Sequence, residues 1–73
     1  MNRRHALEAM LLGKTVRAMR PLYLNHEDPP EFRWNDELQH IEWCEHPNSL
    51  DGQKWHWSQR SFYLSDEFEV TGV

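Results

Sequence analysis

The sequence has little of what builds disulfides, phosphate-binding loops or membrane spans. Cys44 is the only cysteine among 73 residues, which excludes a disulfide within the chain and favours a reducing compartment. The three glycines are isolated from one another, so no glycine-rich phosphate loop is present. No apolar run approaches the roughly 18 residues that a membrane span requires, and no signal peptide is visible. We therefore expect a cytoplasmic protein with no membrane partner.

The length favours one small domain that covers residues 1–73. A chain of this size buries only about 60% of its unfolded surface, so its stability is marginal. Since disulfides are excluded, we expect the chain to gain stability by burying sheet and tryptophan surface against a second copy. The sequence therefore predicts a homo-oligomer.

Charge is distributed unevenly along the chain. Residues 1–20 carry five basic residues and one acidic residue, whereas the rest carries three basic and eleven acidic residues. The acidic balance argues against a protein that binds nucleic acid directly. An acidic body over residues 27–69 is instead suited to imitate nucleic acid and occupy a basic groove.

The hydrophobic period changes once along the chain, from 3.6 to 2. Ala6, Leu7, Met10 and Leu11 form a helical stripe, which predicts a helix over residues 3–12, with Asn2 as N-cap and Gly13 just after its end. Alternation after this point predicts short antiparallel strands. The expected strands cover residues 15–18, 22–24, 32–34, 39–44, 54–59 and 66–70. The fold class predicted is α+β, an N-terminal helix followed by a small antiparallel sheet.

Four tryptophans are the most informative large side chains. If residues 39–44 and 54–59 pair as a hairpin, Trp43 is expected opposite Trp55, and Ile41 opposite Trp57, in one apolar layer. In this arrangement Trp43 and Trp57 belong to the core. Trp34 is expected to be more accessible, as is Trp55.

Catalytic and metal-binding patterns are weak. His40, Cys44 and His56 share a face of this hairpin, with His46 nearby, but no C-x-x-C or H-E-x-x-H spacing occurs. Glu42 and Glu45 flank Cys44, and their charge opposes a reactive thiolate. We therefore predict no metal, no cofactor and no enzymatic activity.

Binding is the chemistry that the composition favours. Tryptophan rings stack on planar ligands, and guanidinium groups pair with phosphate oxygens. Arg33 and Arg60 are also available, but the candidate ligand-binding residues, chosen on chemistry alone, are Arg17, Arg20, Trp34 and Trp55.

The two ends of the chain resemble a family of small phage proteins. Residues 5–17 read HALEAMLLGKTVR, similar to the family's opening EALxxLxxGKxVR. Residues 62–70 read FYLSDEFEV after Trp57-Ser58-Gln59, similar to an ending that typically reads LLAxDWEV. Phe68 stands where the family usually has tryptophan. Met19-Arg20-Pro21 replaces its usual GW, so no ligand residue is carried over.

The resemblance implies a role in the cytoplasm of an infected host. The family includes the second type of Thoeris anti-defence protein, whose members resemble homo-oligomeric sponges for cyclic nucleotide immune signals. The preferred hypothesis is therefore a phage-encoded counter-defence protein that sequesters a nucleotide-type immune signal. The alternative, which uses the acidic body, is an inhibitor like an anti-CRISPR protein that binds a host defence protein directly.

Overall fold

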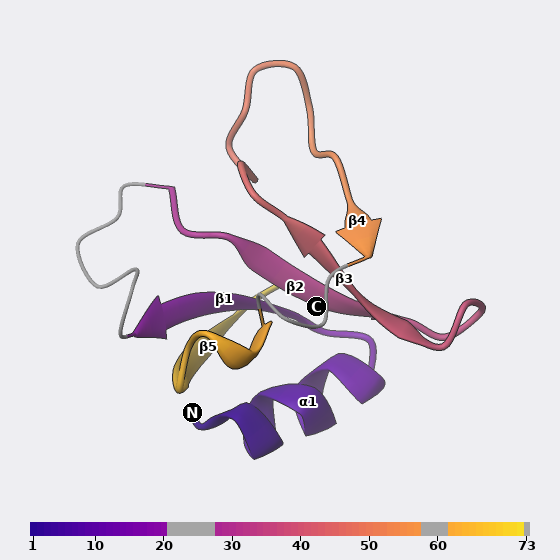
Figure 1. Cartoon of the computed structure of the whole chain (residues 1–73), viewed down its shortest axis with the longest axis vertical. Helices are drawn as coiled ribbons and strands as arrows, with labels where there is room; N and C mark the ends of the chain where they lie inside the picture. Colours follow the sequence, from indigo (N-terminus) through magenta and orange to yellow (C-terminus); the bar gives the residue numbers. More distant parts are fainter. Residues whose placement is uncertain (21–27, 58–61, 73) are drawn as a thin grey trace.

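The computed structural model describes residues 1–20, 28–57 and 62–72, and it has a small α+β fold (Figure 1). The described elements are α1 (Arg3–Leu11), β1 (Thr15–Arg20), β2 (Glu31–Asn35), β3 (His40–Cys44), β4 (His56–Trp57) and β5 (Glu67–Gly72). The strands form one antiparallel sheet in the order β4-β3-β2-β1-β5. The predicted fold class is confirmed. The strand predicted at residues 22–24 lies outside the described residues.

The helix begins and ends where the sequence indicates. The Asn2 side chain accepts a hydrogen bond of 2.9 Å from the backbone N–H of His5, which caps the first turn. Gly13 has a φ of +90°, a conformation that glycine adopts without a steric penalty, and the chain leaves the helix there. The predicted end at residue 12 is one residue late. These local signals fix where α1 enters and leaves the sheet.

One face of the sheet is covered by α1 and forms the hydrophobic core. Ala6 and Met10 of the helix are buried against strand residues, as the stripe predicts. The buried strand residues are Val16, Ala18, Phe32, Ile41 and Phe68. Phe62 completes the core, with its ring centroid 4.8 Å from that of Phe68 and 5.6 Å from that of Phe32. We call this side of the sheet the helix-covered face.

Alternation along the closing strand 66–70 predicts that Phe68 and Val70 both point inward. Phe68 is 1% exposed, which confirms its placement. Val70 pairs with Val16 but is 40% exposed, because β5 is an edge strand of the described sheet. The prediction is therefore right for Phe68, whereas Val70 lies at the border of the core.

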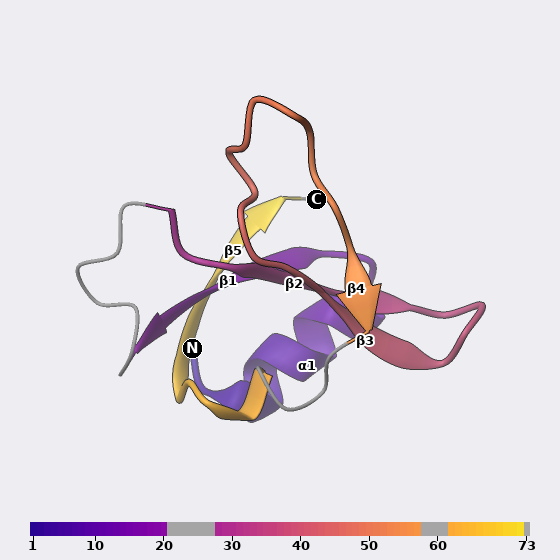
Figure 2. The ribbon, with the colours of Figure 1, turned by 45° about the horizontal axis from the view of Figure 1, so that its top comes forward.

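The hairpin of β3 and β4 forms as predicted, but its register is one residue away from the prediction. Trp43 pairs with His56, and Glu42 pairs with Trp57. Successive side chains of a strand point to opposite faces, so this slip of one residue moves Trp57 to the other side of the sheet. The strand is also shorter than expected, and its predicted end at residues 58–59 lies outside the described residues. In both views of the ribbon, the loop before β4 extends away from α1 (Figures 1 and 2).

The register of β3 and β4 decides on which face of the sheet Trp57 lies. Trp43 packs against the core as predicted, and Trp34 packs there as well. Trp57 is 64% exposed, so its predicted place in the core is wrong. Trp34 thus packs against the core and Trp57 is exposed, the reverse of what the sequence suggested.

Candidate functional site

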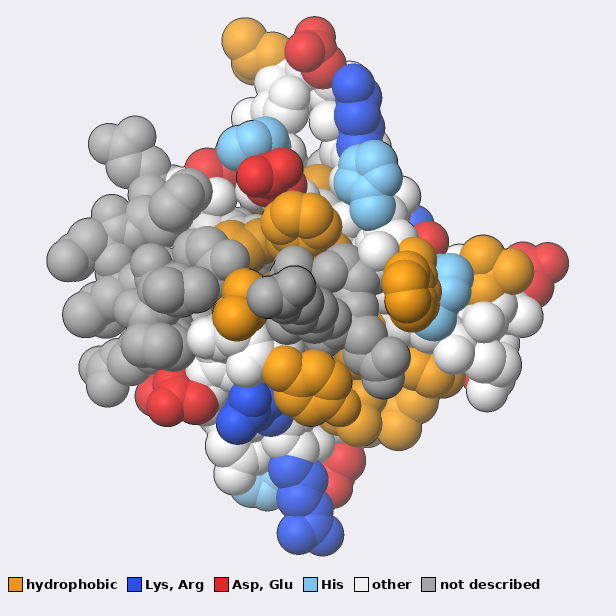
Figure 3. Space-filling view, viewed as in Figure 1, with side chains coloured by type: hydrophobic (Ala, Val, Ile, Leu, Met, Phe, Trp, Pro, Cys, Tyr) orange, Lys and Arg blue, Asp and Glu red, His pale blue; other side chains and the backbone are white. Residues whose placement is uncertain are grey.

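The face of the sheet that points away from α1 carries charged and aromatic side chains. Side chains of paired residues point to the same face, and their pairing across β5, β1, β2, β3 and β4 defines this surface. Pairing places Glu69, Arg17, Glu31, Arg33, Glu42, His40 and Trp57 here, and Trp55 joins them through its contact with Arg33; we call this surface the open face. Figure 3 shows hydrophobic side chains beside a histidine over β3 and β4. No helix of the described chain covers the open face, so it is the natural place for binding.

Arg33 lies at the centre of the most ordered cluster on the open face. Its guanidinium carbon is 4.1 Å from the centroid of the Trp55 ring, a cation–π contact. Its Nε donates a hydrogen bond of 2.9 Å to Oε1 of Glu42. Stacking and pairing together hold the guanidinium in one orientation, as the planar Arg side chain favours.

Glu42 is ionised in this cluster. Burial acts to raise the pKa of its carboxyl, but hydrogen bonds from Arg33 and Asn35 outweigh burial and hold that pKa below its ordinary value. Its side chain is only 12% exposed. Glu42 therefore presents a fixed negative charge under Trp55 and Trp57.

Trp57 is the accessible aromatic residue of the open face. It lies directly across from Glu42 in the register and is 64% exposed. The ring of His40 lies beside it, with the two centroids 6.3 Å apart and the planes tilted by 58°. Nε2 of His40 is also 3.9 Å from Oε2 of Glu42. Tryptophan is among the residues most enriched at the energetic centres of protein interfaces.

The other end of the open face is dominated by ion pairing. Arg17 forms a close ion pair with Glu69 and also lies opposite Glu31. Burial raises the pKa of the Glu31 carboxyl, an effect that Asp28 reinforces and Arg17 only partly offsets. Nε of Arg17 has no hydrogen-bond partner within the described residues. Both arginines of the open face are thus paired with carboxylates.

Two of the four predicted ligand-binding residues share one face of the sheet, but they do not lie together. Arg17 and Trp55 lie on the open face, near opposite ends of the sheet. Trp34 lies on the helix-covered face, where its Nε1 approaches Oδ1 of Asp36 at 3.4 Å. Arg20 ends β1, and its side chain is outside what the structure describes.

Of the residues that build the cluster, the sequence pointed to Trp55 but not to Arg33, Glu42 or Trp57 as contacts. Arg33 alternates with Phe32 and Trp34, so its strand parity alone places it opposite to the core. Its partner Glu42 follows from the pairing of β2 with β3, which strand parity does not give. Trp57 could not be found in this way, because its face depends on a hairpin register that no local signal fixes.

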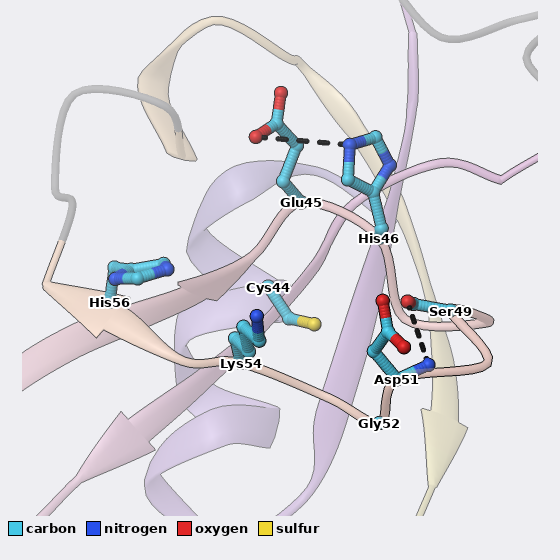
Figure 4. A pocket seen from close by; sticks show the side chains of 8 residues that line it. All are labelled: Cys44, Glu45, His46, Ser49, Asp51, Gly52, Lys54 and His56. Carbon is cyan, nitrogen blue, oxygen red and sulfur yellow. Dashed lines mark hydrogen bonds and ion pairs between the residues drawn. The ribbon is translucent and has the colours of Figure 1, made fainter.

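The loop between β3 and β4 encloses a hollow of about 270 Å³. Its lining residues are Cys44, Glu45, His46, Ser49, Asp51, Gly52, Lys54 and His56. Figure 4 shows the thiol of Cys44 directed into the space between the two arms of this loop. His40, which the sequence grouped with these residues, instead lies beside Trp57. Among the described residues, no three His, Cys, Asp or Glu side chains are placed to hold a metal ion.

Comparisons with known proteins supply no family for this chain. No family model matches it, and no curated protein and no solved structure is found to match it either. Within residues 1–20, 28–57 and 62–72, no helix is long and apolar enough to cross a membrane.

Proposed function

We propose that this chain is a non-catalytic binding module that docks on a partner protein through the open face of its sheet. The observation that carries the proposal is Trp57, an indole that is 64% exposed beside the ordered Arg33–Glu42 pair. Tryptophan and arginine are the residues most enriched among those that dominate interface energies. The helix-covered face is occupied by the core, which leaves the open face for a partner.

The charges of the open face favour a protein partner over a small anion. Arg17 is paired with Glu69, and Arg33 is paired with Glu42. A phosphate-bearing ligand would have to displace these carboxylates, and Glu31 adds a third acidic group. A partner with a basic surface meets no such obstacle, because the carboxylates complement it.

The role we assign to this docking is counter-defence in the cytoplasm of an infected bacterium. The resemblance of the two chain ends to phage proteins supports the setting, and the acidic body supports direct inhibition of a host defence protein. In this proposal the chain occupies a basic surface of the defence protein.

The experiment is a plaque assay on bacteria that carry individual defence systems, each with the chain expressed in trans. We expect restored plaquing against at least one system for the native chain. Trp57→Ala should abolish the restoration, whereas Leu50→Ala is the matched control, since Leu50 is fully exposed in the loop before β4. If both variants restore plaquing equally, the open face is not the docking surface.

A nucleotide-type immune signal is the second candidate partner. It is favoured by the Arg33–Trp55 stack beside the accessible Trp57 ring, since indoles stack on bases and guanidinium groups bind phosphates. Calorimetry of the native chain against cyclic dinucleotides and cyclic ADP-ribose isomers tests it. A binding heat that Arg33→Ala abolishes would favour sequestration of a nucleotide signal. If no nucleotide gives a binding heat, the protein partner remains the favoured one.

We also propose that the chain associates with itself. Its small core leaves Val70 at the sheet edge 40% exposed, and pairing of copies would bury such surface. Native mass spectrometry after gentle purification reports both the subunit number and any retained small molecule. A monomer across a range of protein concentrations would end this part of the proposal.

A further inference from the structure

The open face already holds the guanidinium of Arg33. The groups that contact this guanidinium show which kind of side chain the surface can bind. Arg33 lies against the Trp55 ring at 4.1 Å while its Nε bonds Oε1 of Glu42 at 2.9 Å. An indole thus supplies the stacking surface and a largely buried carboxylate supplies the charge. A planar cation satisfies both at once, which an ammonium group does less well.

Trp57 repeats half of this arrangement, with no cation from the described residues on its ring. It lies across from the same Glu42 and presents the second indole of β4 and the residues leading into it. The described cation–π contacts of the chain involve Trp55 and Tyr63, and Trp57 has none among them. Oε2 of Glu42 faces His40 at 3.9 Å, a separation too long for a hydrogen bond. An exposed ring therefore lies across from a carboxylate that accepts from Arg33 and Asn35 and has lone pairs left for a further donor.

The charge of the open face also favours binding of a cation. Its described acidic groups are Glu31, Glu42 and Glu69, and its arginines are Arg17 and Arg33. Carboxylates thus outnumber arginines among these described groups. The surface thus complements a cation that arrives from outside.

We infer that Trp57 and Glu42 form an acceptor site for an arginine side chain of the partner protein. The guanidinium stacks on the exposed face of Trp57 and directs an N–H toward Oε2 of Glu42, as Arg33 does on Trp55 and Oε1. The inference rests on the proposed function, because it specifies which side chain of the partner enters the open face. It predicts that the bound surface of the defence protein presents an arginine rather than a lysine or an apolar residue.

The site can be tested without the partner, using small probes and the native chain. The indole N–H resonance of Trp57 is assigned in a ¹⁵N–¹H spectrum by its loss in Trp57→Phe. N-acetyl-argininamide is then titrated, with N-acetyl-citrullinamide as the uncharged probe of nearly equal shape and N-acetyl-lysinamide as the compact cation. We expect a saturable shift at Trp57 with the arginine probe, at concentrations on the order of tens of millimolar.

The control measurements separate the site from general effects. Citrullinamide should leave the Trp57 resonance unchanged, and lysinamide should bind several-fold more weakly. Leu50→Ala should retain the full response, whereas Glu42→Gln should weaken it. Equal shifts with the arginine and citrulline probes, or a shift at all four indoles alike, would overturn the inference.

Failure of this site and failure of the proposed function give different results. If the arginine probe does not bind but Trp57→Ala still abolishes counter-defence, docking through the open face stands and the acceptor site falls. If the probe binds but Trp57→Ala retains counter-defence, the acceptor site stands and the docking proposal falls.

Discussion

The two faces of the sheet use the same five strands for opposite purposes. The helix-covered face pairs Val16 with Phe32 and Ala18 with Phe68, and all four are buried against α1. On the open face the next residues along, Arg17 and Arg33, are half-exposed and paired with carboxylates. Apolar contacts thus hold the chain together on one side, while the other side carries ordered charge.

The comparison shows that this 73-residue chain has a sheet face on which its core does not depend. Its stability depends on apolar burial, which scales with area and is concentrated under α1. The ion pairs of the open face contribute less, because exposed pairs are screened by water and salt. Residues on the open face are thus available for contact with a partner at little cost in stability.

Removal of the Phe32 ring should have the largest effect on the fold. Phe32 is fully buried, and its ring contacts both Phe62 and Phe68. Phe32→Ala is expected to lower the free energy of unfolding by about 3–5 kcal/mol, which is most of the stability of a domain this small. Urea titration followed by tryptophan fluorescence measures it. A loss below about 1 kcal/mol would mean that the helix-covered face does not hold the fold.

Glu42→Gln should cost less, since it removes a charge-assisted hydrogen bond to the half-exposed Arg33. We expect a loss of about 1 kcal/mol at neutral pH. The pKa of Glu42 is lower in the folded chain, so its contribution is present above the unfolded value of 4.5 and is lost as pH falls through the folded value. The stability gap between native chain and variant should therefore close in acid. A gap that stays constant down to the acid range would contradict the pairing.

Glu31→Gln should raise the stability of the folded chain slightly, by less than Glu42→Gln lowers it. Burial raises the pKa of Glu31, so its ionised form costs the folded chain stability as pH rises through that raised pKa. The variant should be slightly more stable than the native chain at neutral pH and equal to it below pH 4.5. Paired urea titrations at both pH values provide the measurement. Destabilisation at neutral pH would show that attraction to Arg17 outweighs burial.

Trp57→Ala should have the smallest effect on stability, within about 0.5 kcal/mol of the native chain. The side chain is 64% exposed and is absent from the core. Thermal unfolding followed by circular dichroism should give the same midpoint as for Leu50→Ala. A much lower midpoint would assign Trp57 a structural role in the hairpin.

Much of the fold could be predicted from the sequence because it depends on local signals. Asn2 and Gly13 mark the helix ends, and alternation around Val16, Phe32 and Ile41 marks strands. These features act over a few residues, so they can be read without knowledge of the rest of the chain. The same alternation separates Arg17 and Arg33 from the core residues beside them.

The candidate site was predicted only in part, because it depends on long-range pairing. The eleven-residue connection 45–55 between β3 and β4 contains no short turn that would set the register. A shift of one residue was enough to move Trp55 and Trp57 from the predicted layer with Trp43 to the open face. Arg17 and Trp55 were identified, whereas the link between Arg33 and Glu42 required the strand order.

The central claim is that the helix-covered face folds the chain and the open face binds a partner. The most direct measurement is the plaque assay across individual defence systems, with native chain, Trp57→Ala and Leu50→Ala at matched soluble levels. The account predicts restored plaquing with the native chain and Leu50→Ala, and loss with the equally stable Trp57→Ala. Restored plaquing with all three chains, or with none of them, would contradict it.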